Sequence, residues 1–391
     1  MRDFLDIFFI FLKAVGLYFT LTSLFALLPL KKPKTVSYRQ RFAVLIPARN
    51  EEACMAGIIQ SLKNQDYPPE LCDIYVIPNH CTDDTAGAAI RSGAKVLPVS
   101  SAVSSKGAAL HEAFTWLLKN ERHDAYCVLD ADNEAAPDFL SQMNRALQTE
   151  ARAVKSRILT KNAADSVTAA CYEIYFCNAN VFLNRARKVL GLPARLIGTG
   201  FALRRDLLEE LGGWNTATLT EDAEFYALLA ARGEHIAFCP EAVTYDEQPR
   251  TFRESLVQRR RWMSGVLEVG WQKAPALLAG LRFPRSFFGA LDAAIQFLFP
   301  LLQAFLLPLA CVKLVLAPQT LLTGAVSFYL GAMLTGLAAL LLQRRLNRHT
   351  AKALLFYPVF VFSFLPLLTW SLFFPNKTWT PILHMGRPIQ L

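Results

Sequence analysis

The sequence predicts an α/β domain held between membrane-spanning segments. Short runs of branched apolar residues alternate with helical patterns through the middle of the chain, and this alternation is typical of a mostly parallel sheet. Long apolar stretches occur only before and after that part. Hydrophobic residues make up 53% of the 391 residues, which is more than a soluble domain usually contains. The excess therefore indicates membrane segments.

The first apolar stretch, residues 4–30, is long enough to cross a bilayer. A cleaved signal peptide is not expected, because Asp3 offsets Arg2, the stretch is too long and no small-residue cleavage site follows. We therefore predict a retained membrane anchor over residues 1–35. Lys13 within it is expected to extend its ammonium group to the membrane surface.

Further apolar stretches of spanning length follow the middle part, at 291–317, 321–342 and 353–374. Their internal prolines predict kinked helices or segments that lie partly in the membrane interface. The resulting organisation has five parts: anchor 1–35, soluble domain 36–270, interfacial segment 271–290, membrane region 291–375 and tail 376–391.

The net charge of +9 does not indicate a nucleic-acid partner, because the basic residues collect beside the apolar stretches. This is the positive-inside pattern, with added attraction to anionic lipid. It predicts a multi-pass protein of a plasma membrane, bacterial in type, with the domain in the cytoplasm. The loop 343–352 is expected on the same side. The tail 376–391 is expected outside, unless 353–374 is re-entrant. The scattered cysteines fit a reducing compartment.

The elements of the domain follow in order. Strands are predicted at 42–47, 73–78, 94–99 and 125–130, and helices at 52–63, 84–91 and 107–120. Parallel strands end at one edge of a sheet, so the loops that follow them should meet there. None of these loops has a P-loop pattern, and Gly198 and Gly200 lack the third glycine of a dinucleotide site.

The apolar run 125–129 ends on Asp130 and Asp132, for which two interpretations are open. Aspartates favour turns, so the pair can be a turn before the next helix. Two carboxylates one residue apart at the carboxyl edge of a sheet can also bind Mg²⁺ or Mn²⁺, which in turn bind a diphosphate.

The stretch 218–233 also allows a structural and a chemical interpretation. Thr220 can cap a helix whose first turn carries Glu221 and Asp222, where the helix dipole favours acids. Alternatively, Asp222 is a general base that takes a proton from a hydroxyl group.

Residues 252–271 form the last such stretch. They predict either a basic amphipathic helix on the membrane or a site in which Gln258, Arg261 and Trp262 share one helix face. An arginine there can neutralise a diphosphate, and an indole can stack on a sugar ring.

Taken together, the motifs VLIPARNEE, NHCTDD, KG, DAD, GTGF, TED and QRRRW occur in this order over residues 40–270. In this series the chain resembles the membrane-integrated family-2 glycosyltransferases, which include cellulose, hyaluronan and poly-N-acetylglucosamine synthases and many enzymes that add a single sugar. The resemblance implies a GT-A fold, which is a Rossmann-like nucleotide-sugar-binding domain, with flanking transmembrane helices. It also implies inverting transfer from a UDP-sugar to an acceptor hydroxyl, with a β-glycosidic product, in cell-surface polysaccharide synthesis.

The same resemblance implies roles for individual residues. Asp222 would be the catalytic base, and Asp130 and Asp132 would hold Mg²⁺ or Mn²⁺. The donor nucleotide would contact Glu51, Asn79, Lys106, Asp130, Gln258 and Arg261. The acceptor, a glycan or a lipid-linked molecule, would contact Thr199, Gly200, Glu221 and Trp262. Many relatives carry aspartate where this chain has Asn79, whose amide oxygen can accept the same hydrogen bond from uracil.

Two alternatives to a polysaccharide synthase stay open. The Gln-x-x-Arg-Trp motif favours a processive synthase, whereas the small number of apolar stretches favours an enzyme that makes a lipid-linked sugar. A membrane nucleotide-sugar sensor or a transporter is disfavoured, because Asp222 and Trp262 are both present and the chain shows no internal repeat.

Overall fold

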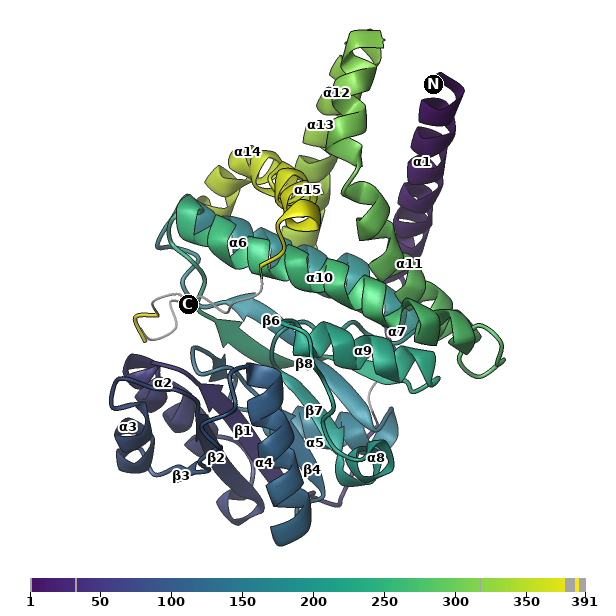
Figure 1. Ribbon diagram of the computed structural model, residues 1–391. Helices are drawn as coiled ribbons and strands as arrows, with labels where there is room; N and C mark the ends of the chain where they lie inside the picture. Colours follow the sequence, from purple (N-terminus) through teal and green to yellow (C-terminus); the bar gives the residue numbers. More distant parts are fainter. Residues whose placement is uncertain (1, 32–33, 317, 377–383, 387–391) are drawn as a thin grey trace.

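An eight-stranded mixed sheet forms the centre of the computed structural model, in the order β3-β2-β1-β4-β7-β6-β8-β5 (Figure 1). The structure describes residues 2–31, 34–316, 318–376 and 384–386. The strands are β1 Phe42–Ala48, β2 Cys72–Pro78, β3 Lys95–Val96, β4 Ala125–Val128, β5 Glu134–Ala135, β6 Ala153–Thr160, β7 Phe201–Arg204 and β8 Ile236–Asp246.

The sheet is mainly parallel, and two of its strands run in the opposite direction. Strands β1 to β4 pair in parallel, as predicted, but β7 lies antiparallel between β4 and β6. The expectation of a mostly parallel sheet is confirmed, because only β7 and β5 run against the other strands. The strand predicted at 94–99 is reduced to Lys95–Val96. An antiparallel strand begins at the edge where its parallel neighbours end. For this reason the start of β7 meets the end of β4.

Helices cover both faces of the sheet (Figure 1). The side chains of β1 alternate between the two cores, with Val44 and Ile46 in one and Ala43 and Leu45 in the other. The first core contains α2 Glu52–Lys63, α3 Thr85–Arg91 and α5 Phe139–Thr149. The second core contains α4 Lys106–Asn120, α8 Arg205–Leu211 and α9 Glu221–Ala231. The three helices predicted at 52–63, 84–91 and 107–120 are present within a residue at each end.

The long helix α10 Phe252–Gly280 lies between the sheet domain and the apolar helices (Figure 1). It begins with a capping box, in which Thr251 and Glu254 exchange hydrogen bonds between side chain and backbone. Arg259 of this helix is buried and donates to the Phe360 carbonyl (2.8 Å) and to Ser363 Oγ (2.7 Å). Its guanidinium also lies 4.1 Å from the centre of the Phe360 ring. Through these contacts Arg259 connects α10 with the helices of the membrane region.

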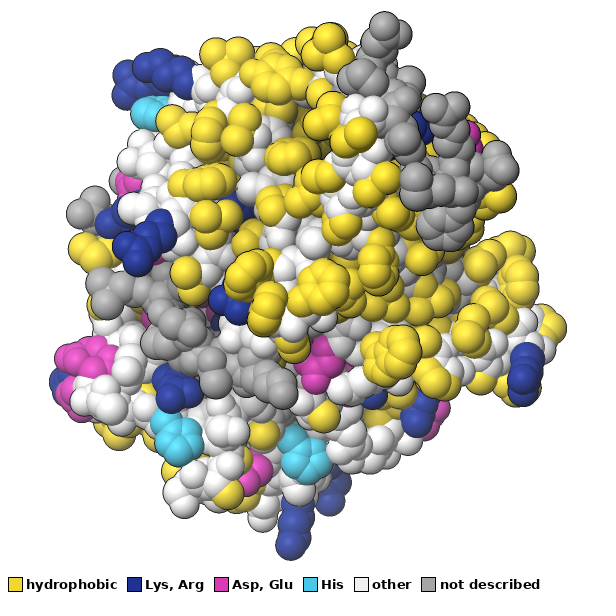
Figure 2. All heavy atoms as spheres, turned by 45° about the horizontal axis from the view of Figure 1, so that its top comes forward, with side chains coloured by type: hydrophobic (Ala, Val, Ile, Leu, Met, Phe, Trp, Pro, Cys, Tyr) yellow, Lys and Arg dark blue, Asp and Glu magenta, His cyan; other side chains and the backbone are white. Residues whose placement is uncertain are grey.

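The remaining helices are mainly apolar. They are α1 Arg2–Leu24, α6 Val167–Asn178, α7 Ala186–Leu190, α11 Phe287–Gln303, α12 Leu306–Leu316, α13 Pro318–Leu342, α14 Arg348–Phe362 and α15 Phe364–Phe373. Two short 3-10 helices, η1 Phe25–Leu27 and η2 Pro69–Leu71, and the π-helix η3 Ala179–Arg185 complete the described elements. Apolar side chains dominate the face of the molecule that these helices form (Figure 2).

In the part of the chain that the structure describes, three helical segments are long and apolar enough to cross a membrane: Asp6–Leu27, Leu322–Leu342 and Arg348–Phe373. The span predicted at 291–317 is broken into two helices that meet at an angle of 47°. Pro308 explains the break, because its ring would clash with the carbonyl of Ala304, where the first of these helices ends.

The described part of the tail lies against the sheet domain. His384, Met385 and Gly386 contact the sheet domain through Glu51 and Glu247, so this part of the tail lies on the same side as the domain. Of the two positions that the sequence left open for the tail, this contact favours the one in which 353–374 is re-entrant. The rest of the tail, including Thr378, lies outside the described residues.

Candidate active site

A cavity of about 900 Å³ lies at the edge where β1, β2 and β4 end, and it extends to α10. It collects most of the side chains that the sequence pointed to, although they come from distant parts of the chain. Those that line it are Glu51, Asn79, Lys106, Asp130, Asp132, Glu221, Asp222, Gln258, Arg261 and Trp262.

Lys106 connects two of the acidic motifs. It is the first residue of α4, which begins there because Ser105 Oγ caps the helix by accepting from Ala108 N–H. The ammonium nitrogen lies 2.6 Å from Asp130 Oδ1 and 3.0 Å from Glu221 Oε1. Burial opposes the charge of Lys106, but the two carboxylates outweigh burial and raise the pKa of the lysine. The cation therefore stays charged inside the cavity.

Thr199 and Gly200 hold the loop that carries Asp130. The Asp130 amide donates to Thr199 Oγ1 at 2.8 Å, and Gly200 N–H donates to the Val128 carbonyl at 2.9 Å. Gly200 has φ +65°, and a Cβ there would lie 2.2 Å from Ser156 Oγ. Neither Thr199 nor Gly200 is among the described residues that line the cavity. The acceptor contact predicted for Thr199 and Gly200 stays a prediction, and the described contacts show that both residues support the Asp130 loop.

The sequence analysis missed Lys155, which supports the same loop from inside β6. Its side chain is buried, and Nζ donates to the Thr199 carbonyl at 2.6 Å. Burial lowers the pKa of Lys155 to about 7, against the attraction of Asp246. Residues 153–160 also contain Ser156 and Arg157, so no signal in the sequence singles out this lysine.

Asp132 is surrounded by other carboxylates in the cavity. Burial, together with repulsion from Asp130, Glu51 and Glu247, raises the pKa of Asp132 to about 7, even though His384 opposes this. Burial likewise raises the pKa of Asp246, with repulsion from Asp132. Acidic side chains outnumber basic ones on the wall of the cavity. Hard carboxylate oxygens with surplus negative charge fit a divalent cation such as Mg²⁺ or Mn²⁺.

Asp222 is held by the loop before β7. Its Oδ2 accepts a short hydrogen bond from the Gly198 amide, and the side chain lines the cavity in the first turn of α9. Thr220 is the N-cap residue of α9, and Glu221 and Asp222 lie in the first turn, as the structural interpretation predicted. The Thr220 side chain, however, caps no backbone group of a described residue. Because the Asp222 side chain lines the cavity, its position is compatible with the predicted role of a base. Next to it, burial raises the pKa of Glu221, although Lys106 opposes this.

Helix α10 supplies the opposite wall of the cavity. Gln258 Oε1 accepts from Tyr172 OH at 2.7 Å, and the half-buried Trp262 stacks on Tyr175 with ring centres 6.3 Å apart. Burial lowers the pKa of Arg261, although carboxylates including Glu221 act in the opposite direction. The helix therefore packs against the membrane region and also lines the cavity with Gln258, Arg261 and Trp262.

Asn79 has an unused acceptor. Its Nδ2 donates to the Ser105 carbonyl at 3.3 Å, whereas Oδ1 is buried without a hydrogen-bond partner among the described residues. A buried acceptor without a partner is costly, so this oxygen is suited to a donor group on a bound molecule.

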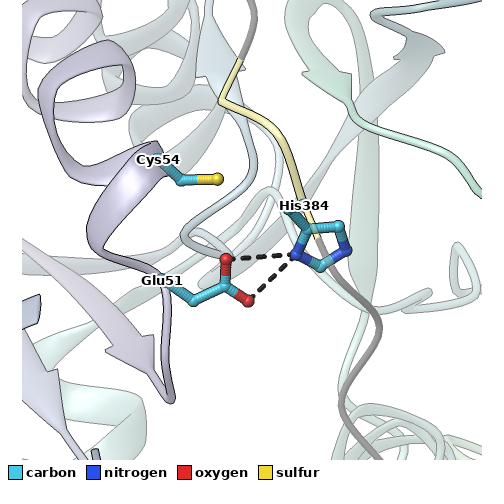
Figure 3. A group of neighbouring side chains, drawn as sticks. All are labelled: Glu51, Cys54 and His384. Atoms are coloured by element: carbon cyan, nitrogen blue, oxygen red, sulfur yellow. Dashed lines mark hydrogen bonds and ion pairs between the residues drawn. The ribbon is translucent and has the colours of Figure 1, made fainter. Parts of the chain in front are cut away.

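His384 enters the site from the tail, and no pattern in the sequence pointed to it. Its Nδ1 lies 3.0 and 3.1 Å from the two carboxylate oxygens of Glu51 (Figure 3), and Nε2 lies 3.5 Å from Asp132 Oδ2. Burial opposes protonation, but Asp132 and Glu51 outweigh burial and raise the pKa of His384 to about 10. Cys54 lies beside this pair, and burial raises the pKa of its thiol. Glu51 is thus engaged by an imidazole, in addition to lining the predicted nucleotide side.

Comparison with known proteins identifies the family. The family model described as "Glycosyltransferase like family 2" matches residues 39–265, which is more than half of the chain. The chain belongs to this family. It is a glycosyltransferase of the GT-A fold, as the motifs predicted.

Relatives of this glycosyltransferase have been named in several bacteria. The chain is 29% identical over 234 residues to "Probable glycosyltransferase YdaM" of Bacillus subtilis, covering 58% of this chain and 55% of that one. It is 28% identical over 230 residues to "Beta-monoglucosyldiacylglycerol synthase" of Nostoc sp., covering 57% and 48%. The chain thus spans about half the length of the curated relatives it matches.

Among solved structures, the fold is similar to that of mannosyltransferase PcManGT from Pyrobaculum calidifontis, in complex with GDP-Man and Mn²⁺. The TM-score is 0.63 at 20% identity, and the match covers 94% of this chain and 99% of the other. The similarity therefore includes the apolar helices as well as the sheet domain.

Proposed function

We propose that this glycosyltransferase moves a sugar from a nucleoside-diphosphate sugar to a hydroxyl group of a membrane lipid. The observation that carries the proposal is that one continuous cavity is lined by acidic side chains and also by apolar side chains. Its acidic end is formed by the sheet edge, and its other end is lined by apolar side chains of α6, η3 and the membrane helices. These side chains are Phe176, Phe182, Phe328, Val361, Phe364, Leu365 and Leu368.

An acceptor with an apolar body and a hydroxyl head fits such a cavity. Burying acyl chains against apolar side chains contributes about 0.8 kcal/mol for each CH₂ group, so the apolar end favours a lipid over a soluble sugar. The apolar face of the membrane region would give such a lipid lateral access (Figure 2). The names of the relatives from cyanobacteria, monoglucosyldiacylglycerol synthases, support the same acceptor class.

The donor would occupy the acidic end. Asn79 Oδ1, which is buried without a hydrogen-bond partner among the described residues, would accept a hydrogen bond from the N3–H group of uracil in a UDP-sugar. Lys106 and Arg261 would attract the diphosphate. A divalent cation held by Asp130 and Asp132 would supply neutralisation of the diphosphate charge as the leaving group forms. The Mn²⁺ and nucleotide sugar bound to PcManGT support this donor chemistry.

Asp222 would act as the base for an inverting displacement. Its carboxylate, oriented by the Gly198 amide, takes the proton of the acceptor hydroxyl. The acceptor oxygen then forms a bond to the anomeric carbon on the side opposite the diphosphate. The bond from that carbon to the diphosphate oxygen breaks, and the electron pair leaves with the nucleoside diphosphate. An α-linked donor would therefore give a β-glycoside.

A polysaccharide synthase is the second candidate. Gln258, Arg261 and Trp262 line the cavity together, and this motif favours repeated addition to a growing glycan. The two candidates differ in the size of the product.

The membrane arrangement is proposed from the same observations. The basic residues near the apolar segments and the docked tail both support a cytoplasmic domain and a cytoplasmic tail. In this arrangement 348–373 enters the membrane interface without crossing it. The proposal includes the division into anchor 1–35, domain 36–270 and membrane region 291–375.

The function is tested with purified enzyme in liposomes that contain diacylglycerol. A panel of radiolabelled UDP-sugars and GDP-mannose would be supplied with Mn²⁺, followed by lipid extraction, thin-layer chromatography and sizing of the aqueous fraction. A labelled lipid that carries one sugar is expected, and Asp222→Asn should not form it. Label found only in a high-molecular-weight polymer would favour the second candidate instead.

A further inference from the structure

Gln248 is a polar side chain on the cavity wall that the chemistry described above does not use. It lines the cavity, and only 5% of its surface is exposed. Its Oε1 is buried without a hydrogen-bond partner among the described residues. A buried amide oxygen without a partner costs free energy, so this oxygen does not stabilise the fold. It is suited to a hydrogen bond with a bound molecule.

The backbone around Gln248 is held in place by a buried side chain. Gln248 N–H donates to Asn162 Oδ1 at 2.8 Å, and the Gln248 carbonyl accepts from Asn162 Nδ2 at 2.9 Å. Just before it, Lys161 N–H donates to the Asp246 carbonyl at 2.7 Å. A residue whose backbone is already fixed loses less conformational freedom when it binds a ligand. The position of Gln248 is therefore preorganised.

The order of the strands places Gln248 relative to the other polar groups of the site. Strand β4, which ends at the aspartate motif, lies between β2 on one side and β8 on the other, and β8 runs in the same direction as β4. Asn79 follows β2, whereas Gln248 follows β8. Asn133 of the loop after β4 donates a short hydrogen bond to Asp246, so the end of β8 meets this loop.

This order matches the order of the parts of a nucleoside-diphosphate sugar. In the proposed function, Asn79 binds the nucleobase, and the diphosphate lies at the end of β4. The sugar, which is the remaining part of the donor, would then lie on the side of β8. A sugar hydroxyl both donates and accepts hydrogen bonds, and a glutamine amide does the same. The two groups are therefore complementary.

We propose that Gln248 binds a hydroxyl group of the sugar that is transferred, with Asn162 as the residue that positions it. The inference rests on the proposed function and assigns a residue to the recognition of the sugar part of the donor. The nucleobase and the diphosphate are bound elsewhere, so Gln248 would distinguish a UDP-sugar from UDP.

Binding to the full-length enzyme in detergent tests this inference without any transfer reaction. Isothermal titration calorimetry with Mn²⁺ and without acceptor lipid compares UDP with UDP-glucose, UDP-galactose and UDP-N-acetylglucosamine. Gln248→Met keeps the length of the side chain and removes the amide. The affinity for the UDP-sugar that the unchanged enzyme binds best should fall on the order of 10-fold, whereas the affinity for UDP should change by less than about twofold.

Thermal unfolding shows whether the variant is folded. Since Gln248 Oε1 bonds to no described residue, Gln248→Met should leave the Tm of the ligand-free enzyme unchanged or raise it. Gln60→Met, at an exposed position of α2, is the matched control and should change neither Tm nor the affinities.

Two results would overturn the inference: an unchanged UDP-sugar affinity in Gln248→Met, or an equal loss of affinity for UDP and the UDP-sugar. A rise in the KM for the acceptor lipid, with donor affinity unchanged, would likewise assign Gln248 to the acceptor. Binding by the unchanged enzyme separates the two levels. If it binds neither UDP nor any of the three UDP-sugars, the donor class of the proposed function is wrong as well, whereas normal binding with no effect of Gln248→Met refutes only the role of Gln248.

Discussion

The Lys106 ammonium nitrogen lies 2.6 Å from Asp130 Oδ1, although the two residues belong to different strand–helix units. The same nitrogen reaches Glu221 at 3.0 Å. Lys106 is therefore the cation that joins the motif at the end of β4 to the motif at the start of α9. A bound diphosphate would compete with these two carboxylates for the positive charge of Lys106.

Replacement of Lys106 tests this connection. Lys106→Met should weaken UDP binding on the order of 10- to 100-fold, because a charge-assisted hydrogen bond contributes about 1.5 to 3 kcal/mol. Isothermal titration calorimetry with Mn²⁺ present measures the affinity. Lys106→Arg keeps the charge and should recover part of it. Unchanged UDP affinity in Lys106→Met would assign the lysine to holding the two carboxylates alone.

Replacement of Asp222 should separate chemistry from binding. Asp222→Asn is expected to lower the transfer rate by about 10²- to 10⁴-fold, with UDP affinity nearly unchanged, since a base acts on the chemical step. Steady-state kinetics and UDP titration measure the two quantities. Glu209→Gln, at an exposed position of α8, is the control. A parallel loss of UDP affinity in Asp222→Asn would indicate a binding role.

Trp262 should affect the acceptor side. The indole packs on Tyr175 and lines the cavity, so Trp262→Ala removes a stacking surface. Loss of such a surface costs up to a few kcal/mol, so the KM for the acceptor should rise at least tenfold while UDP binding stays normal. Slow release of free sugar by reaction with water is also expected. Transfer at the normal rate would mean that Trp262 only packs α10 against α6.

Asp73 predicts a pH dependence of stability. Burial opposes the charge of Asp73, but Lys95, His123 and Arg41 outweigh burial and lower the pKa of this carboxyl from 3.8 to about 2. A lowered acid pKa stabilises the fold above the unfolded-state value, and this contribution is lost as the pH falls from 3.8 toward 2. Asp73→Asn should therefore lower Tm at neutral pH, with a difference that narrows below about pH 4.

Differential scanning fluorimetry over this pH range measures the difference. The exposed Asp66 is the comparison, and Asp66→Asn should leave Tm close to that of the unchanged protein at each pH. A Tm difference for Asp73→Asn that stays constant to the lowest pH would contradict the assignment.

The side of the domain can be determined by cysteine labelling. Ser37 is exposed and follows the anchor, so a Ser37→Cys variant in a Cys311→Ser background should resist an impermeant thiol reagent in intact cells. It should become labelled once the cells are broken open. Labelling of intact cells would place the domain outside and overturn the proposed topology.

The local sequence was enough to predict much of the site. An apolar run that ends on Asp130 and Asp132, and a helix that begins with Glu221 and Asp222, are patterns set by neighbouring residues. The parallel geometry of β1, β2 and β4 then brings the following loops to one edge. For this reason the sequence alone predicts that Glu51, Asn79 and Lys106 lie close together.

Other parts of the site depend on contacts that neighbouring residues do not encode. The antiparallel insertion of β7 decides that Thr199 and Gly200 lie behind the cavity wall. Burial of Lys155 under the same loop depends on which strands pair with β6. A residue's exposure is a property of the packed sheet, so a polar side chain in a strand can be assigned to the cavity or the core only from the structure.

The sequence by itself thus determined the fold class, the family and the acidic motifs, because each depends on patterns within a few residues. Only the tertiary structure decided that His384 meets Glu51 and Asp132, and that the polar cavity continues into an apolar one. His384 lies 333 residues from Glu51 along the chain. Their contact results from the path of the chain through the membrane region, and no short-range pattern records that path.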